Sequence, residues 1–200
     1  MTHTIAFVGD IHGHAQALDD VLSKLGADVR TVVFLGDYVN RGPDSKGVLE
    51  RLLALQSGPR EIVLLSGNHD RQLERVLVDD AALNDFLRMG GAATIRSYVG
   101  PPYRNVLSQL RGAVPTSHRQ LLASMVDTWE TEEVVATHNA EEAPRGDNRF
   151  VVAGHDLQTG LLPVIRDHTA LIDTGCGTMS GGRLTALLWP SLEWVQSDQV

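Results

Sequence analysis

Short aliphatic runs recur along the chain, and each one ends in a polar loop. Continuous apolar runs of about four to six residues, rich in Val, Ile and Leu, are typical of strands buried on both faces of a sheet. We therefore predict strands within residues 4–8, 31–35, 61–65, 133–137, 149–153, 169–172 and 183–189.

Helical spacing of apolar residues separates the first three runs. Residues 15–25 and 45–55 each place leucines and valines three or four positions apart, which is the pattern of an amphipathic helix. The order strand, loop, helix, strand favours parallel pairing with right-handed crossovers. The fold class expected from this pattern is α/β.

Residues 71 to about 130 follow a different pattern. Helices are predicted over 71–78, 81–89 and 120–129, whereas the glycines and prolines of GGAATIRSYVGPPYRN, residues 90–105, are expected to break regular structure. We interpret this region as a helical cap inserted between core strands. The whole chain, residues 1–200, is then a single domain.

Composition and charge narrow the function further. The 200 residues are 42% hydrophobic, which is enough for one full core. A net charge of −8 disfavours general nucleic-acid binding and anionic membranes, although bound metal ions can still attract a small phosphorylated substrate. The single cysteine, Cys176, excludes an internal disulfide. The chain has neither a membrane-spanning run nor a recognisable signal peptide, so we expect a cytoplasmic protein.

Metal-ligand residue types follow the predicted strands in order. They are Asp10, His12, Asp37, Asn68, His69, His138 and His155. In an α/β sheet, ligands gather beyond the carboxyl ends of the strands, so these side chains are expected to meet. Carboxylate, imidazole and amide oxygen suit divalent Mn, Fe, Zn or Mg. Each residue alone is common in turns, but turn chemistry does not explain the whole ordered set.

The motifs carry a family resemblance. GDIHG at 9–13, GDYVNRG at 36–42, GNHD at 67–70, TH at 137–138 and GH at 154–155 resemble the calcineurin-like metallophosphoesterases. The sequence is most similar to their phosphoprotein phosphatase branch and its small bacterial serine/threonine or tyrosine phosphatases. The resemblance implies a four-layer αββα sandwich, with two mixed β-sheets and a small helical cap.

The resemblance also implies a site with two divalent metal ions, with Mn²⁺ preferred. Asp10 and His12 would bind the first ion, Asp37 would bridge both, and Asn68, His138 and His155 would bind the second. A hydroxide shared by the two ions would attack phosphorus. The catalytic residues would be Asp37, His69 as the general acid, and Arg41, which would hold the phosphate oxygens together with Asn68.

Two departures from the family pattern bear on the substrate. Asn40 stands where the phosphatases have an aspartate that partners the general-acid histidine. The symmetric diadenosine tetraphosphatases of the same superfamily branch also tolerate a non-acidic residue there. The loop between His138 and His155 is short and lacks the usual place for a second phosphate-binding arginine, so Arg145 and Arg149 are its candidate replacements.

The leading expectation is a phosphatase acting on phosphomonoesters, either phosphoproteins (Ser, Thr or Tyr) or a small phosphate ester. The first alternative is a symmetric dinucleoside tetraphosphate hydrolase, and the second is a non-catalytic binding protein that keeps the fold. Asn40 and the sequence His138-Asn139-Ala140 are the features that keep the last alternative open.

Overall fold

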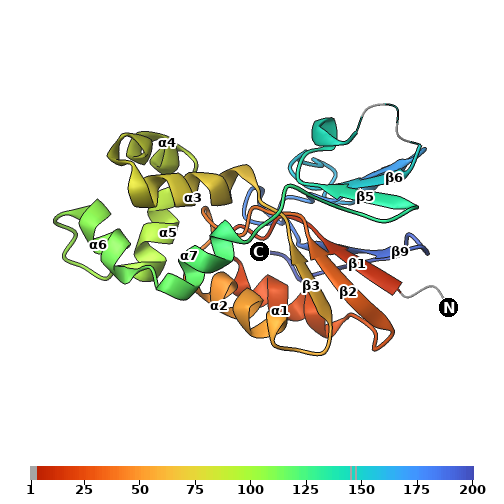
Figure 1. The fold of residues 1–200 in the computed structure, drawn as a ribbon, viewed down its shortest axis with the longest axis horizontal. Coiled ribbons are helices and arrows are strands. Elements are labelled where there is room, and N and C mark those ends of the chain that lie inside the picture. Colours follow the sequence, from red (N-terminus) through yellow and green to blue (C-terminus); the bar gives the residue numbers. More distant parts are fainter. Residues whose placement is uncertain (1–3, 145, 147) are drawn as a thin grey trace.

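The computed structural model describes residues 4–144, 146 and 148–200. Within these residues the chain forms two five-stranded sheets, which lie one above the other in Figure 1. The first sheet has the order β10-β9-β1-β2-β3. Its strands are β1 (Thr4–Val8), β2 (Val29–Phe34), β3 (Glu61–Leu64), β9 (Thr185–Trp189) and β10 (Trp194–Gln196).

The first three strands of the chain, β1, β2 and β3, form the parallel part of the first sheet. β1 pairs with β2 and β2 with β3 in the parallel sense, whereas β9 returns antiparallel to β1. The crossovers are α1 (Ala15–Ser23) and α2 (Ser45–Gln56), which cover the outer face of this sheet. Asp44 caps α2 by accepting a hydrogen bond from the backbone of Gly47 at 2.8 Å. The carboxyl ends of β1, β2 and β3 therefore meet at one edge.

The second sheet has the order β4-β5-β6-β8-β7. Its strands are β4 (Thr128–Glu130), β5 (Val134–Thr137), β6 (Phe150–Ala153), β7 (Val164–Arg166) and β8 (Thr169–Leu171). β5, β6 and β8 run parallel, and β4 and β7 are antiparallel edge strands. Among the described residues after β5, the only helical turn is η2 (Ala140–Glu142), so the outer helical layer on this side is a single turn.

The two sheets pack face to face around an apolar core. Phe7, Val33 and Leu65 of the first sheet contact Val134, Val152 and other buried residues of the second. A second cluster joins the first sheet to its helices. These two mixed sheets with their helices confirm the predicted α/β architecture.

Between β3 and β4 the chain forms a helical cap. It consists of α3 (Asn68–Val78), η1 (Asp80–Ala82), α4 (Leu83–Arg88), α5 (Gly91–Tyr98), α6 (Val106–Ala113) and α7 (Thr116–Ala123). In Figure 1 these helices form a lobe beside the sheets.

The cap differs from its prediction in three places. Residues 106–113, for which no helix was predicted, form α6. Residues 91–98, expected to be irregular, form α5, because Gly90 adopts a left-handed φ of 85° that starts the helix, and Ala93 and Ile95 are then buried. The predicted helix over 120–129 was wrong at its C-terminal end. There α7 ends at Ala123 and Thr128–Glu130 pairs with β5 as an edge strand.

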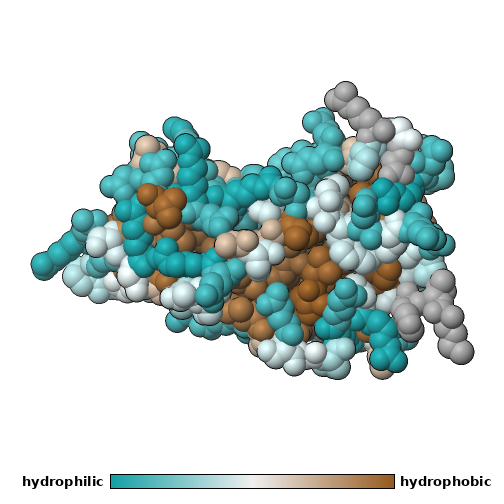
Figure 2. Space-filling view, in the orientation of Figure 1, coloured by the Kyte–Doolittle hydropathy of each residue, from teal (hydrophilic) through white to brown (hydrophobic). Residues whose placement is uncertain are grey.

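The surface reflects this arrangement. Figure 2 shows a largely hydrophilic face, with hydrophobic surface gathered along the edge strand β3 and a smaller patch on the helical cap. The outline is hollowed between the cap and the sheets. Across the ranges 4–144, 146 and 148–200, no helix combines the length and apolarity needed to cross a bilayer.

Candidate metal centre

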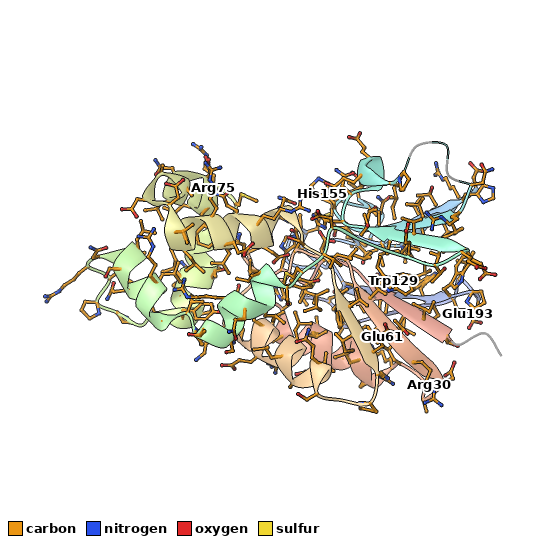
Figure 3. All side chains as sticks on the ribbon, viewed as in Figure 1. Arg30, Glu61, Arg75, Trp129, His155 and Glu193 are labelled. Carbon is orange, nitrogen blue, oxygen red and sulfur yellow. The ribbon has the colours of Figure 1, made fainter. Side chains whose placement is uncertain are left out.

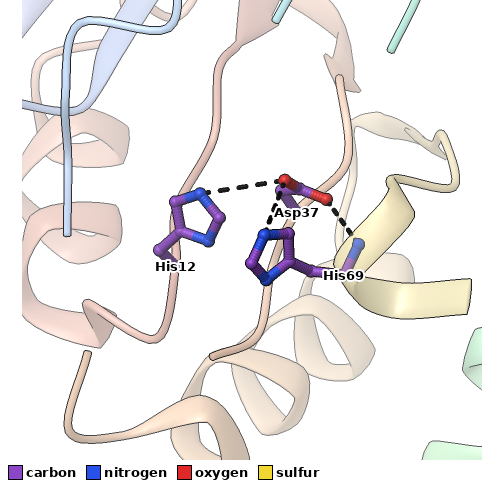
Figure 4. A group of neighbouring side chains, drawn as sticks. All are labelled: His12, Asp37 and His69. Carbon is purple, nitrogen blue, oxygen red and sulfur yellow. Dashed lines mark hydrogen bonds and ion pairs between the residues drawn. The ribbon is translucent and has the colours of Figure 1, made fainter. Parts of the chain in front are cut away.

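Asp37 lies at the centre of the site, directly after β2. Its Oδ2 atom is 3.8 Å from His12 Nε2 and 3.8 Å from His69 Nε2. Its Oδ1 atom is 3.5 Å from His138 Nε2. Figure 4 shows His12, from a loop, and His69, from the first turn of α3 (Asn68–Val78), converging on this carboxylate. One buried carboxylate thus faces three imidazole rings.

The loops that carry these side chains approach one another at backbone distance. Gly36 has a φ of 105°, and a Cβ atom there would lie 2.6 Å from the backbone nitrogen of Gly67. Only glycine fits such a contact and such a φ without strain. The Asp70 carboxylate joins the same loops, because it accepts hydrogen bonds from the backbone of Asp37 at 2.7 Å, Tyr38 at 3.0 Å and Gly67 at 3.0 Å.

Two of the histidines are oriented as metal ligands. His12 Nδ1 donates to the carbonyl of Val39 at 3.2 Å, and His138 Nδ1 donates to the carbonyl of Leu35 at 2.8 Å. Each ring therefore carries its proton on Nδ1 and directs the Nε2 lone pair toward Asp37. A backbone carbonyl that fixes the outer ring nitrogen in this way is the usual support of a metal-binding histidine.

A second group of ligand atoms surrounds Asn68 at the start of α3. Asn68 Oδ1 is 3.0 Å from His138 Nε2 and 3.1 Å from His155 Nδ1. The lone pairs of His138 Nε2 and Asn68 Oδ1 face one another, and a cation beside both atoms satisfies them. His155 is exposed, and Figure 3 places it at the boundary between the cap and the sheets, away from Arg30 and Glu193 at the other end of the strands.

Further carboxylates make the site strongly electronegative. Asp10 lies 3.9 Å from His12 Nε2 and accepts a hydrogen bond from the backbone of His155 at 3.1 Å. Burial, together with the charges of Asp173 and Asp37, raises the pKa of Asp10 well above its ordinary value. Burial also raises the pKa of Asp173 to about 6, and Asp37 adds to this shift. Buried carboxylates that repel one another in this way fit a site that holds divalent cations.

His69 differs from the other rings in the direction of its hydrogen bond. Asn40 Nδ2 donates to His69 Nδ1 at 3.0 Å, so the ring's own N–H is on Nε2, the atom that faces Asp37. His12, Asp37 and His69 are close enough together to hold an ion, but a protonated Nε2 offers no lone pair to a metal. Burial lowers the pKa of His69 to about 4, and the charge of Arg41 contributes in the same direction.

Arg41 reaches the same edge from the loop after β2. Its Nη1 donates to His12 Nε2 at 3.0 Å and to the hydroxyl of Thr178. Its backbone nitrogen donates to the carbonyl of Gly90 at 3.3 Å, which ties the arginine to the cap. The guanidinium is therefore held beside the ligand atoms, where a planar cation can pair with phosphate oxygens.

Asp173 and Thr178 were missed at the sequence level. Asp173 directly follows the strand run 169–172, so it obeys the same strand-end rule as the other carboxylates. It is buried at 3% exposure and accepts a hydrogen bond from the backbone of Gly175. The family resemblance gave no role to Asp173. The rule that functional residues follow the carboxyl ends of strands would have identified it.

Arg149, one of the two candidate loop arginines, is not brought to the site. Arg149 precedes β6, whereas His155 follows it, and its guanidinium binds the carbonyl of Thr131 at 2.7 Å and Glu130 at 2.9 Å. The placement of Arg149 on the substrate stays a prediction, and in this structure these partners hold its guanidinium at the opposite end of the strand from His155. Arg145 lies outside the described residues.

Comparison with known proteins agrees with this site. The calcineurin-like phosphoesterase model matches residues 3–159, which is most of the chain. The chain belongs to the calcineurin-like phosphoesterase family, whose members are metal-dependent hydrolases.

Two relatives in this family illustrate the similarity. An asymmetrical bis(5′-nucleosyl)-tetraphosphatase from Oceanobacillus iheyensis is 24% identical, over 96% of this chain and 90% of the relative. A symmetrical bis(5′-nucleosyl)-tetraphosphatase from Ralstonia nicotianae is 30% identical, over 68% of this chain and 47% of the relative.

Solved structures confirm the fold. A putative diadenosine tetraphosphatase superposes with a TM-score of 0.71 at 21% identity, covering 100% of this chain and 95% of the other. A cold-active protein-tyrosine phosphatase from a Shewanella species gives a TM-score of 0.56 at 14% identity, covering 94% and 76%. Both identities are low enough that these structures bear on the fold alone.

Proposed function

We propose that this chain is a two-metal hydrolase that cleaves phosphoanhydride bonds in dinucleoside polyphosphates. The observation that carries the hydrolase is the carboxylate of Asp37, which faces His12 through Oδ2 and His138 through Oδ1. The substrate class is supported by the relatives that align with nearly the whole chain, which are named as bis(5′-nucleosyl)-tetraphosphatases.

The proposed ligand set follows the two groups of lone pairs. Asp10 and His12 would hold the first ion, Asn68, His138 and His155 would hold the second, and Asp37 would contribute to both. Divalent ions bound there supply positive charge that lowers the pKa of the attacking water and offsets charge on the phosphate oxygens. The carboxylate, imidazole and amide acceptor atoms of this set suit Mn²⁺, with Fe, Zn and Mg as the other candidates.

The chain's own residues then orient the substrate. Arg41 turns its guanidinium from His12 and Thr178 to two phosphate oxygens, which a planar fork can bind with parallel hydrogen bonds. His69 presents Nε2–H beside Asp37, within reach of an oxygen on the reacting phosphorus. The hollow between the cap and the sheets, where the exposed His155 lies, is the entrance for the polyphosphate chain.

Phosphomonoesters are the second candidate. Arg41 and His69 are both positioned to bind the oxygens of a single phosphoryl group, and this binding does not require a nucleoside. A phosphopeptide or a small phosphate ester would therefore be bound by the same two side chains.

The test compares kcat/KM for diadenosine tetraphosphate, a phosphoserine peptide and a phosphotyrosine peptide, with Mn²⁺ restored after chelation. The proposal expects a strong preference for the dinucleotide. Products of ATP and AMP would indicate asymmetrical cleavage, and two molecules of ADP would indicate symmetrical cleavage. A preference for a peptide would replace the proposal with the second candidate. Absence of turnover on every substrate would support a non-catalytic role. Asp37→Asn is the matched control for contaminating phosphatases.

A further inference from the structure

Asn40 connects the cap to the candidate centre. It is fully buried, and its backbone nitrogen donates to the hydroxyl of Ser45 at 3.1 Å and to that of Thr94 at 2.9 Å. Ser45 begins α2 and Thr94 lies within α5 of the cap. The residue also has a φ of 73°, a conformation that Asn and Asp tolerate better than most residues.

The side-chain amide of Asn40 has a defined direction. The hydroxyl of Thr94 donates to Asn40 Oδ1 at 2.8 Å, and the hydroxyls of Thr94 and Ser45 are themselves 2.9 Å apart. With Oδ1 occupied in this way, the Nδ2 group is left to face His69 Nδ1, at 3.0 Å. The amide is a donor at this position, so His69 Nδ1 is an acceptor and the ring's N–H lies on Nε2.

We infer that Asn40 is a positioning residue that sets the leaving-group preference of the site. Through His69 it presents a fixed N–H at Nε2, which donates a hydrogen bond to the departing oxygen but keeps its proton. The inference rests on the proposed function, because it assumes that the reacting phosphorus lies beside Asp37 and His69.

The chemistry of the leaving group gives the preference. Water gives up one proton to solvent and its oxygen forms the new bond to phosphorus, while the bond from phosphorus to the leaving oxygen breaks with its electron pair on that oxygen. A nucleoside phosphate leaves as a stable anion and takes no proton. A serine alkoxide takes one, and a ring whose Nδ1 accepts from an amide would be left as an imidazolate. The hydrogen bond from Asn40 therefore favours phosphoanhydrides over alkyl phosphate esters.

A carboxylate at position 40 would reverse the hydrogen bond. Aspartate accepts at both oxygens, so it would keep the bond from Thr94 and accept a second bond from His69 Nδ1–H. With Nδ1–H held by the carboxylate, Nε2 can carry a second proton, and a ring that gives this proton to an alkoxide is left neutral. The backbone is left unchanged, since Asp also tolerates a positive φ. Asn40→Asp therefore changes the direction of one hydrogen bond with little change in volume.

The first measurement is the tautomer of His69, from the ¹⁵N chemical shifts of the histidine rings in the metal-free protein. The His69 signals are assigned by their loss in His69→Gln. The wild type is expected to have its proton on Nε2 alone. Asn40→Asp is expected to have Nδ1 protonated, with a second proton on Nε2 in the form that donates to an alkoxide. A wild-type ring that already carries its proton on Nδ1 would overturn the inference, without bearing on whether the protein is a hydrolase.

The second measurement is the leaving-group dependence of kcat with Mn²⁺. The series runs from diadenosine tetraphosphate through aryl phosphates of stepped acidity to a phosphoserine peptide. Asn40→Asp is expected to raise turnover of the peptide by about tenfold or more while diadenosine tetraphosphate changes by less than about threefold. Thr94→Val, which frees the amide of Asn40, should shift the same ratio in the same direction by less.

The outcomes separate the two proposals. If kcat depends on the acidity of the leaving group in the same way in the wild type and in Asn40→Asp, and both turn over, the role of Asn40 is rejected. The proposal that the protein is a hydrolase is then unaffected. Absence of turnover on the whole series would reject the proposed function, and the ring tautomer would still decide the orientation of His69. If Asn40→Asp does not fold, the His69 tautomer and the leaving-group dependence of kcat are both measured on Thr94→Val.

Discussion

The carboxylate of Asp70 accepts a hydrogen bond from the backbone nitrogen of Asp37 at 2.7 Å, although 33 positions separate the two residues. The same carboxylate binds the backbone of Tyr38 and Gly67. Asp70 contacts no ligand side chain through these bonds; instead it holds the loops after β2 and β3 together. The position of the Asp37 carboxylate therefore depends on Asp70, which accepts these hydrogen bonds from backbone nitrogens.

Asp70→Ala should be strongly destabilising, because it leaves three buried N–H groups without their acceptor. We expect a loss of roughly 3–5 kcal/mol in the free energy of unfolding, measured by urea denaturation. Asp127→Ala is the matched control, since its ion pair with Arg71 is exposed and contributes less than about 1 kcal/mol. Equal effects of the two changes would contradict the role given to Asp70.

Stability should depend on pH through Asp173. Its pKa is raised from 3.8 to about 6, so between these values the folded protein binds the proton more tightly than the unfolded chain. In the metal-free protein this carboxyl therefore lowers stability as pH rises from about 4 to 6. Asp173→Asn should match the wild type below pH 4 and exceed it by roughly 2–3 kcal/mol above pH 6.

The comparison is made by denaturation in the presence of a chelator at several pH values. The lowered pKa values of His12 and His69 give the opposite slope, but they are common to both proteins and largely cancel in the difference. Added Mn²⁺ should remove the advantage of Asp173→Asn, since a cation offsets the same charge. A constant difference across the whole pH range would contradict the assignment.

His69→Ala should separate metal binding from turnover. Its Nε2 carries the ring proton, so the variant is expected to retain metal. Loss of the hydrogen bond to the departing oxygen should lower kcat by about 100-fold or more. Metal content is measured after gel filtration and compared with His138→Ala, which removes a lone pair directed at Asp37 and should lose metal. Loss of metal from His69→Ala would make His69 a ligand.

Arg149→Gln should leave catalysis unchanged. Its guanidinium binds Thr131 and Glu130 at the opposite end of β6 from His155, so we expect kcat/KM within about twofold of the wild type and a stability loss below about 1 kcal/mol. Arg41→Gln is the contrasting variant, expected to raise KM and lower kcat. A large loss in kcat/KM from Arg149→Gln would return this residue to the substrate.

Much of the site could be predicted from local sequence because each ligand follows a continuous apolar strand. Asp10 after β1, Asp37 after β2 and His138 after β5 needed only the rule that the carboxyl ends of parallel strands meet. The same reasoning predicted the two crossover helices, α1 and α2. Their apolar residues recur at helical spacing and are buried in the structure.

The features that were not predicted depend on contacts between distant residues. The hydrogen bond between Asn40 and Thr94 spans 54 positions. Thr94 lies in α5, within residues 90–105, a segment predicted to be irregular because of its glycines and prolines. Arg149 was placed by its charge, but its position relative to β6 puts it at the opposite end of the strand from His155. Local pattern specifies the direction of a strand and its end, while the partner of a side chain is set by the assembled fold.

The attachment of the cap has a consequence for evolution. Gly90 and Thr94 bind the backbone of Arg41 and Asn40, two consecutive residues of the loop after β2. Recombination that imports a cap from a relative would therefore also replace the neighbours of both residues. We therefore expect the cap and this loop to change together, so lineages that acquire a new substrate should show paired substitutions in both segments.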